Sequence, residues 1–283
     1  TSATSVAYNA LTNSGNGMFF AAVRYHGFYS SPDGVHWTRL TAQPGGGALS
    51  TASCPAQSTS NGRACPIYRG EITSIPERNE MYAWYVSVDA NGITQDEGIW
   101  QSLNGGASWT AISDAGITNC GDITGCGVEQ GVYNLELLAV PNGSATDLYA
   151  GAVNIYKCAI NSSNPTCTAS PFVNLTHAYG CVPAGAPAHV HPSQHALAAV
   201  IPSIGGDSGN ELLYFATDGG VYRALNGFSG FNDGACSAVH QFDDLNQNLG
   251  SLAQFVSFSQ HPTDGNTLLG GAQGNGSPAT NHA

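Results

Sequence analysis

The stretch GFYSSPDGVHW at Gly27–Trp37 decides the fold that we expect for this chain. It starts with a glycine, continues through a short aromatic segment, and ends in a Ser-x-Asp-Gly turn that precedes a tryptophan. The aspartate accepts backbone N–H bonds across such a turn, and the glycine supplies the positive φ that other residues resist. The tryptophan then fills the space between neighbouring sheets. The pattern therefore predicts a strand, a tight turn and an aromatic plug that form one unit.

This pattern returns along the chain as an internal repeat. GIWQSLNGGASW at Gly98–Trp109 repeats it closely, GVYRALNGFSGF at Gly220–Phe231 repeats it loosely, and NIYKC at Asn154–Cys158 keeps the strand without the turn. The aromatic positions that we expect to be equivalent are Tyr29, Trp100, Tyr156 and Tyr222. They are separated by 71, 56 and 66 residues, so the chain contains several similar units of irregular length.

Five units can be aligned on this repeat, each with an inner strand and a second strand before the aromatic strand. Their apolar runs include Met18–Gly27, Met81–Val88, Asn134–Pro141, His195–Pro202 and Gln254–Pro262. The runs have strand length, are separated by Gly, Asn, Asp and Pro, and show no amphipathic helical pattern. We therefore predict an all-β chain, a β-propeller of four-stranded antiparallel blades, with a β-sandwich as the alternative.

The two best turns resemble the Asp-box, or BNR repeat, of sialidases, xyloglucanase-type glycosidases, sortilin-like receptors and secreted bacterial propellers. The first turn is one residue shorter than S-x-D-x-G-x-x-W, the second has Asn in place of Asp, and the third copy has Ala224 and Phe231 at the serine and tryptophan positions. The expected structural positions are Ser31, Asp33, Gly34 and Trp37, and Ser102, Asn104, Gly105 and Trp109.

The resemblance covers roughly Ser5 to Ser277 and is specific for a propeller, not for an activity. It implies a single propeller domain, or a fragment of one, over residues 1–283. Such propellers commonly have seven blades, whereas about four complete units and a partial fifth are visible here. The remaining blades are expected to precede Thr1, to follow Ala283, or to come from another chain that completes the ring.

The composition excludes some partners. The 283 residues carry a formal net charge of −12 with only seven Lys and Arg, which argues against nucleic acid or an anionic membrane surface. No apolar run is long enough to span a bilayer. The hydrophobic content of 42% argues against disorder. The resemblance to extracellular Asp-box propellers implies a glycan or an extracellular protein as the partner.

The eight cysteines indicate the compartment. Their even number, their short spacings and the absence of CxxC favour disulfides over zinc, with free thiols as the alternative. We expect a secreted, periplasmic or cell-surface protein, because disulfides persist in oxidising environments. The expected pairs are Cys54–Cys65, Cys120–Cys126, Cys158–Cys167 and Cys181–Cys236.

Polar residues are expected at one end of the propeller. The inner strands start at the end where the second strand turns into the third, and the Asp-box turns lie at the other end. Convergent polar groups in a concavity form the default binding site. The rim predicted in this way contains Arg24, Tyr25, His26, Arg69, Glu71, Tyr133, Glu136, His195, Asp218, Gln254 and Gln273.

Two kinds of chemistry are weighed at this rim. Glu71, Glu136 and Asp218 are candidate catalytic carboxyls, because a glycosidase needs two carboxyl groups across a sugar; the alternative is that each serves its own turn or is solvated. His189, His191 and His195 have spacing that would suit a metal, but no Cys or carboxylate near them completes a ligand set. No cofactor is expected, and a structural cation is left open.

Two hypotheses for the function follow. The first is a non-catalytic extracellular propeller that binds glycans or proteins, or serves as a surface module. The second is a secreted glycoside hydrolase of xyloglucanase-like or sialidase-like type. The six arginines form no recognisable triad for a sialic acid, which favours the first hypothesis. The excess of acidic residues suits a neutral, hydroxyl-rich ligand or a cation.

Overall fold

A computed structural model gives the fold, and its regular structure is nearly all β. It describes residues 2–54, 65–75, 77–118, 127–178, 190–200, 212–224, 242–247 and 263, and the backbone of 255–260, 267–272 and 279–281. In these ranges the helical structure consists of the 3₁₀ turn η1 (Gly46–Leu49) and the short helix α1 (Ala115–Thr118). No helix among the described residues is long and apolar enough to cross a membrane.

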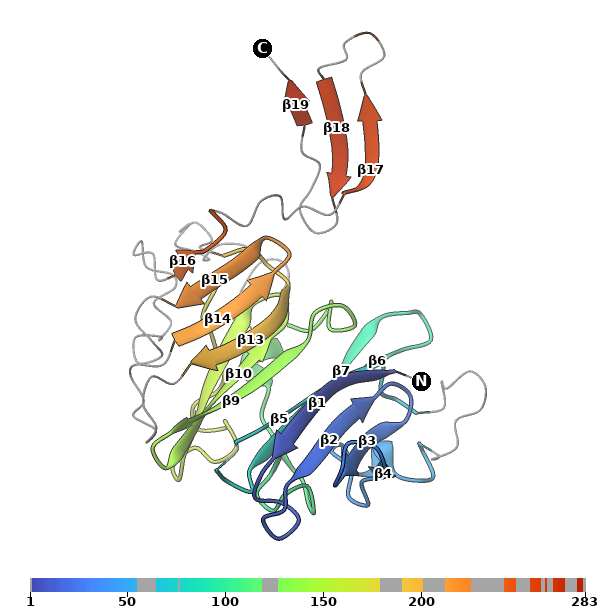
Figure 1. Cartoon of the computed structure of the whole chain (residues 1–283), viewed down its shortest axis with the longest axis vertical. Coiled ribbons are helices and arrows are strands. Elements are labelled where there is room, and N and C mark those ends of the chain that lie inside the picture. Colours follow the sequence, from blue (N-terminus) through green and yellow to red (C-terminus); the bar gives the residue numbers. More distant parts are fainter. Residues whose placement is uncertain are drawn as a thin grey trace.

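Four sheets each contain four antiparallel strands that are paired in chain order (Figure 1). The first sheet consists of β1 (Ala3–Asn9), β2 (Met18–Val23), β3 (Gly27–Ser31) and β4 (Thr38–Arg39). The second consists of β5 (Arg69–Ser74), β6 (Met81–Val88), β7 (Thr94–Ser102) and β8 (Thr110–Ile112). The third consists of β9 (Glu136–Asn142), β10 (Ala145–Gly151), β11 (Ile155–Ile160) and β12 (Val173–Asn174). The fourth consists of β13 (Gln194–Val200), β14 (Leu212–Thr217), β15 (Gly220–Ala224) and β16 (Phe242–Asp244).

A fifth sheet has three described strands and stands apart from the other four in Figure 1. Its strands are β17 (Phe255–Gln260), β18 (Thr267–Ala272) and β19 (Ala279–Asn281). The prediction of a nearly all-β chain built from four-stranded antiparallel sheets is therefore confirmed for the first four units.

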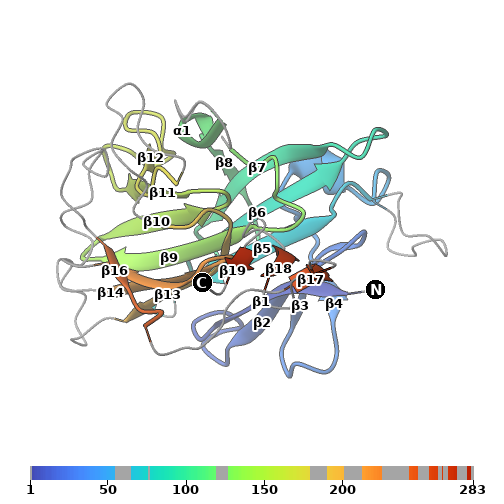
Figure 2. The ribbon, with the colours of Figure 1, turned by 90° about the horizontal axis from the view of Figure 1, so that it is seen from above.

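The four sheets follow one another in chain order when the molecule is seen from above (Figure 2). A separate apolar core fills each boundary between neighbouring sheets. Phe28 and Tyr85 belong to the first boundary, Trp84 and Tyr156 to the second, and Tyr149 with Phe215 to the third. Face-to-face packing of four-stranded sheets, with their first strands on the inside, is how propeller blades bury their apolar faces.

The four aromatic residues of the repeat lie on the third strand of their sheets. Tyr29 pairs with Ala21, Trp100 with Ala83, Tyr156 with Ala150, and Tyr222 with Phe215. The last three of these aromatics pack against the preceding sheet. Tyr29 instead lies on the outer face of the first sheet, where Val6 is 57% exposed.

The turn after β3 is held by the side chains that the sequence singled out. Ser31 Oγ accepts the N–H of Gly34 at 2.9 Å, and Asp33 Oδ1 accepts the N–H groups of Val35 and His36 at 2.8 Å each. The indole Nε1 of Trp37 donates to Gly34 O. These side chains are therefore engaged in closing their own turn. Trp37 is 38% exposed on the outer face of the first sheet, so the prediction that it fills the space between sheets is wrong for this turn.

The turn after β7 repeats this arrangement with one difference in register. Ser102 Oγ accepts the N–H of Gly106 at 2.8 Å, and Asn104 Oδ1 accepts the N–H of Ser108 at 2.9 Å. The sequence assigned the glycine position to Gly105, but Gly106 is the counterpart of Gly34 because this turn is one residue longer. Gly105 also has positive φ, and its N–H donates to Asn79 O.

In the third sheet a disulfide occupies the corresponding position of the third strand. Cys158 stands where Ser31 and Ser102 stand in the first two sheets, and it is bonded to the buried Cys167. A second disulfide joins Cys54 to Cys65. The remaining expected pairs, Cys120–Cys126 and Cys181–Cys236, lie outside the described residues.

Candidate functional site

The candidate site lies where the inner strands begin. Because each inner strand is antiparallel to the second strand of its sheet, Glu136 pairs with Gly151 at the end of β10, and Gln194 pairs with Thr217 at the end of β14. A Cβ at Gly151 would lie 3.2 Å from that of Glu136 and 3.1 Å from that of Gln194, so the third and fourth sheets approach closely here. We call the following set of residues the rim: Arg69, Glu71, Tyr133, Glu136, His195 and Asp218.

Arg69 links the second sheet to the third. Its Nε donates to Glu71 Oε1 at 3.2 Å, and its Nη2 donates to Glu136 Oε1 at 3.0 Å and to Leu135 O at 2.8 Å. Its Nη1 donates to the carbonyl oxygen of Tyr133. All three guanidinium nitrogens are therefore held by protein acceptors.

Burial sets the protonation of the two glutamates beside Arg69. It raises the pKa of Glu71 from 4.5 to about 7, and the nearby charge of Arg69 offsets only part of this effect. The pKa of Glu136 is raised to about 8 by burial and by the charge of Glu71, against the effect of Arg69. One cation is therefore shared by two carboxyl groups whose pKa values both lie close to or above neutral pH.

Tyr133, His195 and Asp218 form the other half of the rim. Tyr133 Oη donates to Asp218 Oδ1 at 2.7 Å, and His195 Nε2 lies 2.8 Å from the same oxygen. The rings of Tyr133 and His195 meet edge to face with centroids 4.7 Å apart. Burial and the bond to Asp218 raise the pKa of Tyr133 to about 12, so its hydroxyl stays a donor. Tyr133 is 38% exposed, which leaves an aromatic surface open to a ligand.

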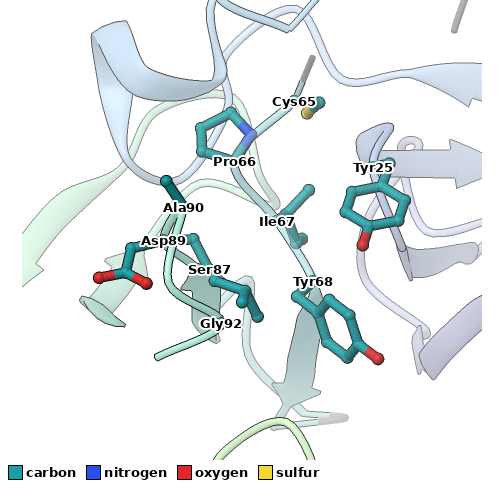
Figure 3. Close-up of a pocket in the computed structure, with 10 residues that line it drawn as sticks. Tyr25, Cys65, Pro66, Ile67, Tyr68, Ser87, Asp89, Ala90 and Gly92 are labelled. Atoms are coloured by element: carbon teal, nitrogen blue, oxygen red, sulfur yellow. The ribbon is translucent and has the colours of Figure 1, made fainter. Parts of the chain in front are cut away.

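A cavity of about 390 Å³ lies beside the rim, between the first and second sheets (Figure 3). Tyr25 and Tyr68 line one side, with ring centroids 5.8 Å apart, and Ser87 and Asp89 line the other. Asp89 Oδ1 accepts the N–H groups of residues 91 and 93, so this carboxylate serves its own turn. The guanidinium of Arg24 lies 4.3 Å from the centre of the Tyr68 ring.

The structure separates His26 from the other predicted rim residues. Tyr25 has a left-handed backbone with φ of 61°, and the side chains of Tyr25 and His26 lie on different sides of the turn. Tyr25 lines the cavity between the sheets, whereas His26 lines an apolar cavity on the outer face of the first sheet. Gln254 and Gln273 lie outside the residues whose side chains are described.

The histidine motif does not converge in its described part. His191 Nδ1 is 3.0 Å from Pro192 O, whereas His195 bonds to Asp218. His189 lies outside the described residues. Within the described ranges, no group of three or more His, Cys, Asp or Glu side chains is arranged to hold a metal ion.

The sequence did not single out the polar residues behind Tyr133. Gln130 Oε1 accepts from Asn134 Nδ2 at 3.1 Å and from Ser193 Oγ at 3.0 Å, which connects the third sheet to the start of β13. Asn134 and Ser193 are buried. They fall in loops without a recognisable motif, so no pattern in the chain marks them.

Comparison with known proteins gives structural likenesses only. No protein-family model matches the chain, and no curated protein matches it. It is similar to YCF48 from Cyanidioschyzon merolae, with 14% identity and a TM-score of 0.39, over 94% of this chain and 66% of that chain. It is also similar to the GH93 α-L-arabinofuranosidase of Fusarium graminearum, with 11% identity and a TM-score of 0.46, over 94% and 74% of the two chains. The α-L-arabinanase of Penicillium chrysogenum gives 14% identity and a TM-score of 0.44, over 96% and 78%. Similarity at this level carries no information on activity.

Proposed function

We propose that this chain binds neutral, hydroxyl-rich glycans at the rim without cleaving them. The observation that carries the proposal is the exposed ring of Tyr133, packed edge to face on the half-buried ring of His195, with both held by Asp218. An aromatic ring offers a flat surface to the C–H face of a sugar, and a carboxylate beside it accepts hydroxyl protons.

The state of Arg69 supports a neutral ligand. Its donors are engaged with Glu71, Glu136 and two backbone carbonyls, so it has no paired N–H groups to offer a sugar carboxylate. Bidentate recognition of a carboxylate requires such a free pair. The two glutamates beside it would also repel an acidic sugar when they are ionised.

Glycoside hydrolysis is the second candidate, and the raised pKa values of Glu71 and Glu136 favour it. A general acid works best with a pKa near the operating pH, which both groups satisfy. A glycosidase pair, however, has environments that push the two pKa values apart, so that one carboxyl is protonated and the other ionised. Here both are raised, and both side chains are at least four-fifths buried against one arginine. The burial of both glutamates and their similarly raised pKa values therefore favour glycan binding over hydrolysis.

The two disulfides support an extracellular location for this function. Cys54–Cys65 and Cys158–Cys167 would persist in an oxidising compartment. We therefore propose a secreted, periplasmic or cell-surface protein whose partners are glycans outside the cell.

Calorimetric titration with neutral oligosaccharides, chosen from a glycan array, tests the proposal. Tyr133→Phe keeps the ring and should retain binding within a few-fold, whereas Tyr133→Ala should weaken it at least about tenfold. Tyr8→Ala is the matched control, because Tyr8 is an exposed tyrosine on the first sheet, away from the rim. Equal loss in both alanine variants would contradict a site at Tyr133.

Release of reducing ends from the same glycans distinguishes the two candidates. We expect none. If a polysaccharide is cleaved, and if Glu71→Gln, Glu136→Gln or Asp218→Asn abolishes the cleavage while the fold survives, the hydrolase replaces the binding module.

A further inference from the structure

A second cavity, of about 670 Å³, lies away from the rim between the first two sheets. The segment from Arg39 at the end of β4 lines one side, and Trp109 before β8 lines the other. This volume falls within the range of about 300–1,000 Å³ that is common for small-molecule pockets. Its remaining lining residues include Leu40, Thr41, Ser50, Thr51 and Ser108.

Arg39 is the basic group of this cavity, and no acidic side chain pairs with it among the described residues. Its Nε donates to His26 O at 3.1 Å and its Nη2 donates to Leu49 O at 2.7 Å. These two carbonyl groups fix the plane of the guanidinium, while Nη1 donates to no described residue. Burial lowers the pKa of Arg39 from 12.5, in keeping with a cation that lacks a compensating anion.

Trp109 gives the cavity an oriented aromatic wall. Its Nε1 donates to Ala42 O at 3.2 Å, which ties the indole to the first sheet. The indole is partly buried and packs with Leu40 against the core of the first boundary. Hydroxyl groups of Thr41, Thr51 and Ser108 line the same space. An aromatic face with hydroxyl donors and acceptors around it matches the two sides of a sugar ring.

We propose that this cavity binds an acidic saccharide, whose carboxylate pairs with Arg39 and whose ring packs on Trp109. The fixed guanidinium offers Nη1 and part of Nη2 to a carboxylate, and charge-assisted hydrogen bonds of this kind are about twice as strong as neutral ones. The net charge of −12 opposes any anion at long range, so affinity comes from contacts inside the cavity. The site thus has a ligand preference opposite to that of the rim.

Two methyl glycosides that differ in one group test this proposal. Methyl β-D-glucuronide and methyl β-D-glucoside share the pyranose ring, but only the first has a carboxylate. In calorimetric or NMR titrations of the intact chain, we expect the glucuronide to bind at least about tenfold more tightly. Arg39→Gln should remove this difference, and Arg39→Lys should retain part of it because lysine keeps the charge without the planar fork.

Three controls separate the site from other causes. Thr51→Trp fills the cavity from an exposed position with Arg39 intact, so it should abolish glucuronide binding even if Arg39→Gln fails to fold. Arg223→Gln removes the same charge from the fourth sheet and should leave binding unchanged, as should Tyr133→Ala at the rim. The proposal is wrong if the two glycosides bind equally, or if Thr51→Trp leaves glucuronide affinity intact. It is also wrong if acetate alone binds as tightly as the glucuronide, since the cavity would then be an anion site without sugar recognition.

Discussion

Replacing Glu71 by glutamine should remove a pH dependence from the stability of the fold. Glu71 is 7% exposed, and burial raises its pKa from 4.5 to about 7. A carboxyl with a raised pKa holds its proton longer in the folded chain than in the unfolded chain. Its stabilising contribution is therefore complete below pH 4.5 and is lost as the pH rises through about 7. The wild-type chain should become less stable between pH 5 and pH 9.

The size of this effect follows from the two pKa values. Each pH unit between 4.5 and about 7 is equivalent to about 1.4 kcal/mol, which gives an upper limit of about 3.5 kcal/mol. Glu136 extends the pH range over which stability is lost to about pH 8, but part of the rise in its pKa arises from the charge of Glu71. The two contributions therefore overlap and do not add in full. In the Glu71→Gln variant the side-chain amide oxygen can still accept the N–H of Arg69, so the substitution removes the titration while keeping that bond.

Denaturant unfolding at pH 5, 7 and 9, followed by tryptophan fluorescence, measures the effect. We expect the free energy of unfolding of the wild type to fall relative to Glu71→Gln as the pH rises, by up to about 3.5 kcal/mol. Glu129→Gln is the matched control, because Glu129 is an exposed carboxyl in the segment that precedes β9. The free energy of unfolding of this variant should change with pH as that of the wild type does. Parallel wild-type and Glu71→Gln curves over the whole range would refute the reasoning.

Three further predictions concern the cores and turns. Tyr156→Ala empties a fully buried site between the second and third sheets, so it should lower the free energy of unfolding in denaturant melts by about 3–5 kcal/mol. Tyr29→Ala, on the outer face of the first sheet, should lower it by about 1 kcal/mol or less. Replacing Cys158 and Cys167 together by serine opens a loop with a sequence separation of 9 and should cost about 2–3 kcal/mol, measured against the oxidised wild type. Ser102→Ala removes the acceptor of the Gly106 N–H and should cost about 1 kcal/mol; an unchanged melt would show that this turn does not depend on the serine.

The third strands were predictable from the sequence because their pattern is local. A Gly or Asn, an aromatic residue two positions later and a Ser or Cys four positions later mark β3, β7 and β11, and each pairs with its second strand as expected. The two-residue fourth strands β4 and β12 were not located, since such short pairings have no periodicity of their own. The exact glycine of the second turn was also missed, because Gly105 and Gly106 are adjacent and only the hydrogen bonds tell them apart.

The rim was partly predictable from strand order. Knowing that inner strands begin at one end was enough to bring Arg69, Glu71, Glu136 and His195 together. It was not enough to place His26, whose side depends on the left-handed conformation of Tyr25. The cavity at Arg39 and Trp109 was out of reach, because its two walls are contributed by different sheets and no motif joins them.

Several arginines of this chain bond to backbone carbonyl groups, so replacing one of them can destabilise the fold as well as remove a ligand contact. Arg24 donates to the carbonyl of Tyr68, and Arg78 donates to the carbonyl of Ala145 at 3.0 Å, so each joins its own sheet to the next, as Arg69 does. Carbonyl groups outside the strand ladders lose water where sheets meet, and a guanidinium satisfies several of them at once. Arg24, Arg69 and Arg78 therefore stabilise boundaries between sheets, whereas Arg39 and Arg223 bond within their own sheet or its loop. A loss of ligand binding in an arginine variant identifies a contact only when the unfolding midpoint is unchanged, and the cavity-filling Thr51→Trp variant supplies that distinction for Arg39.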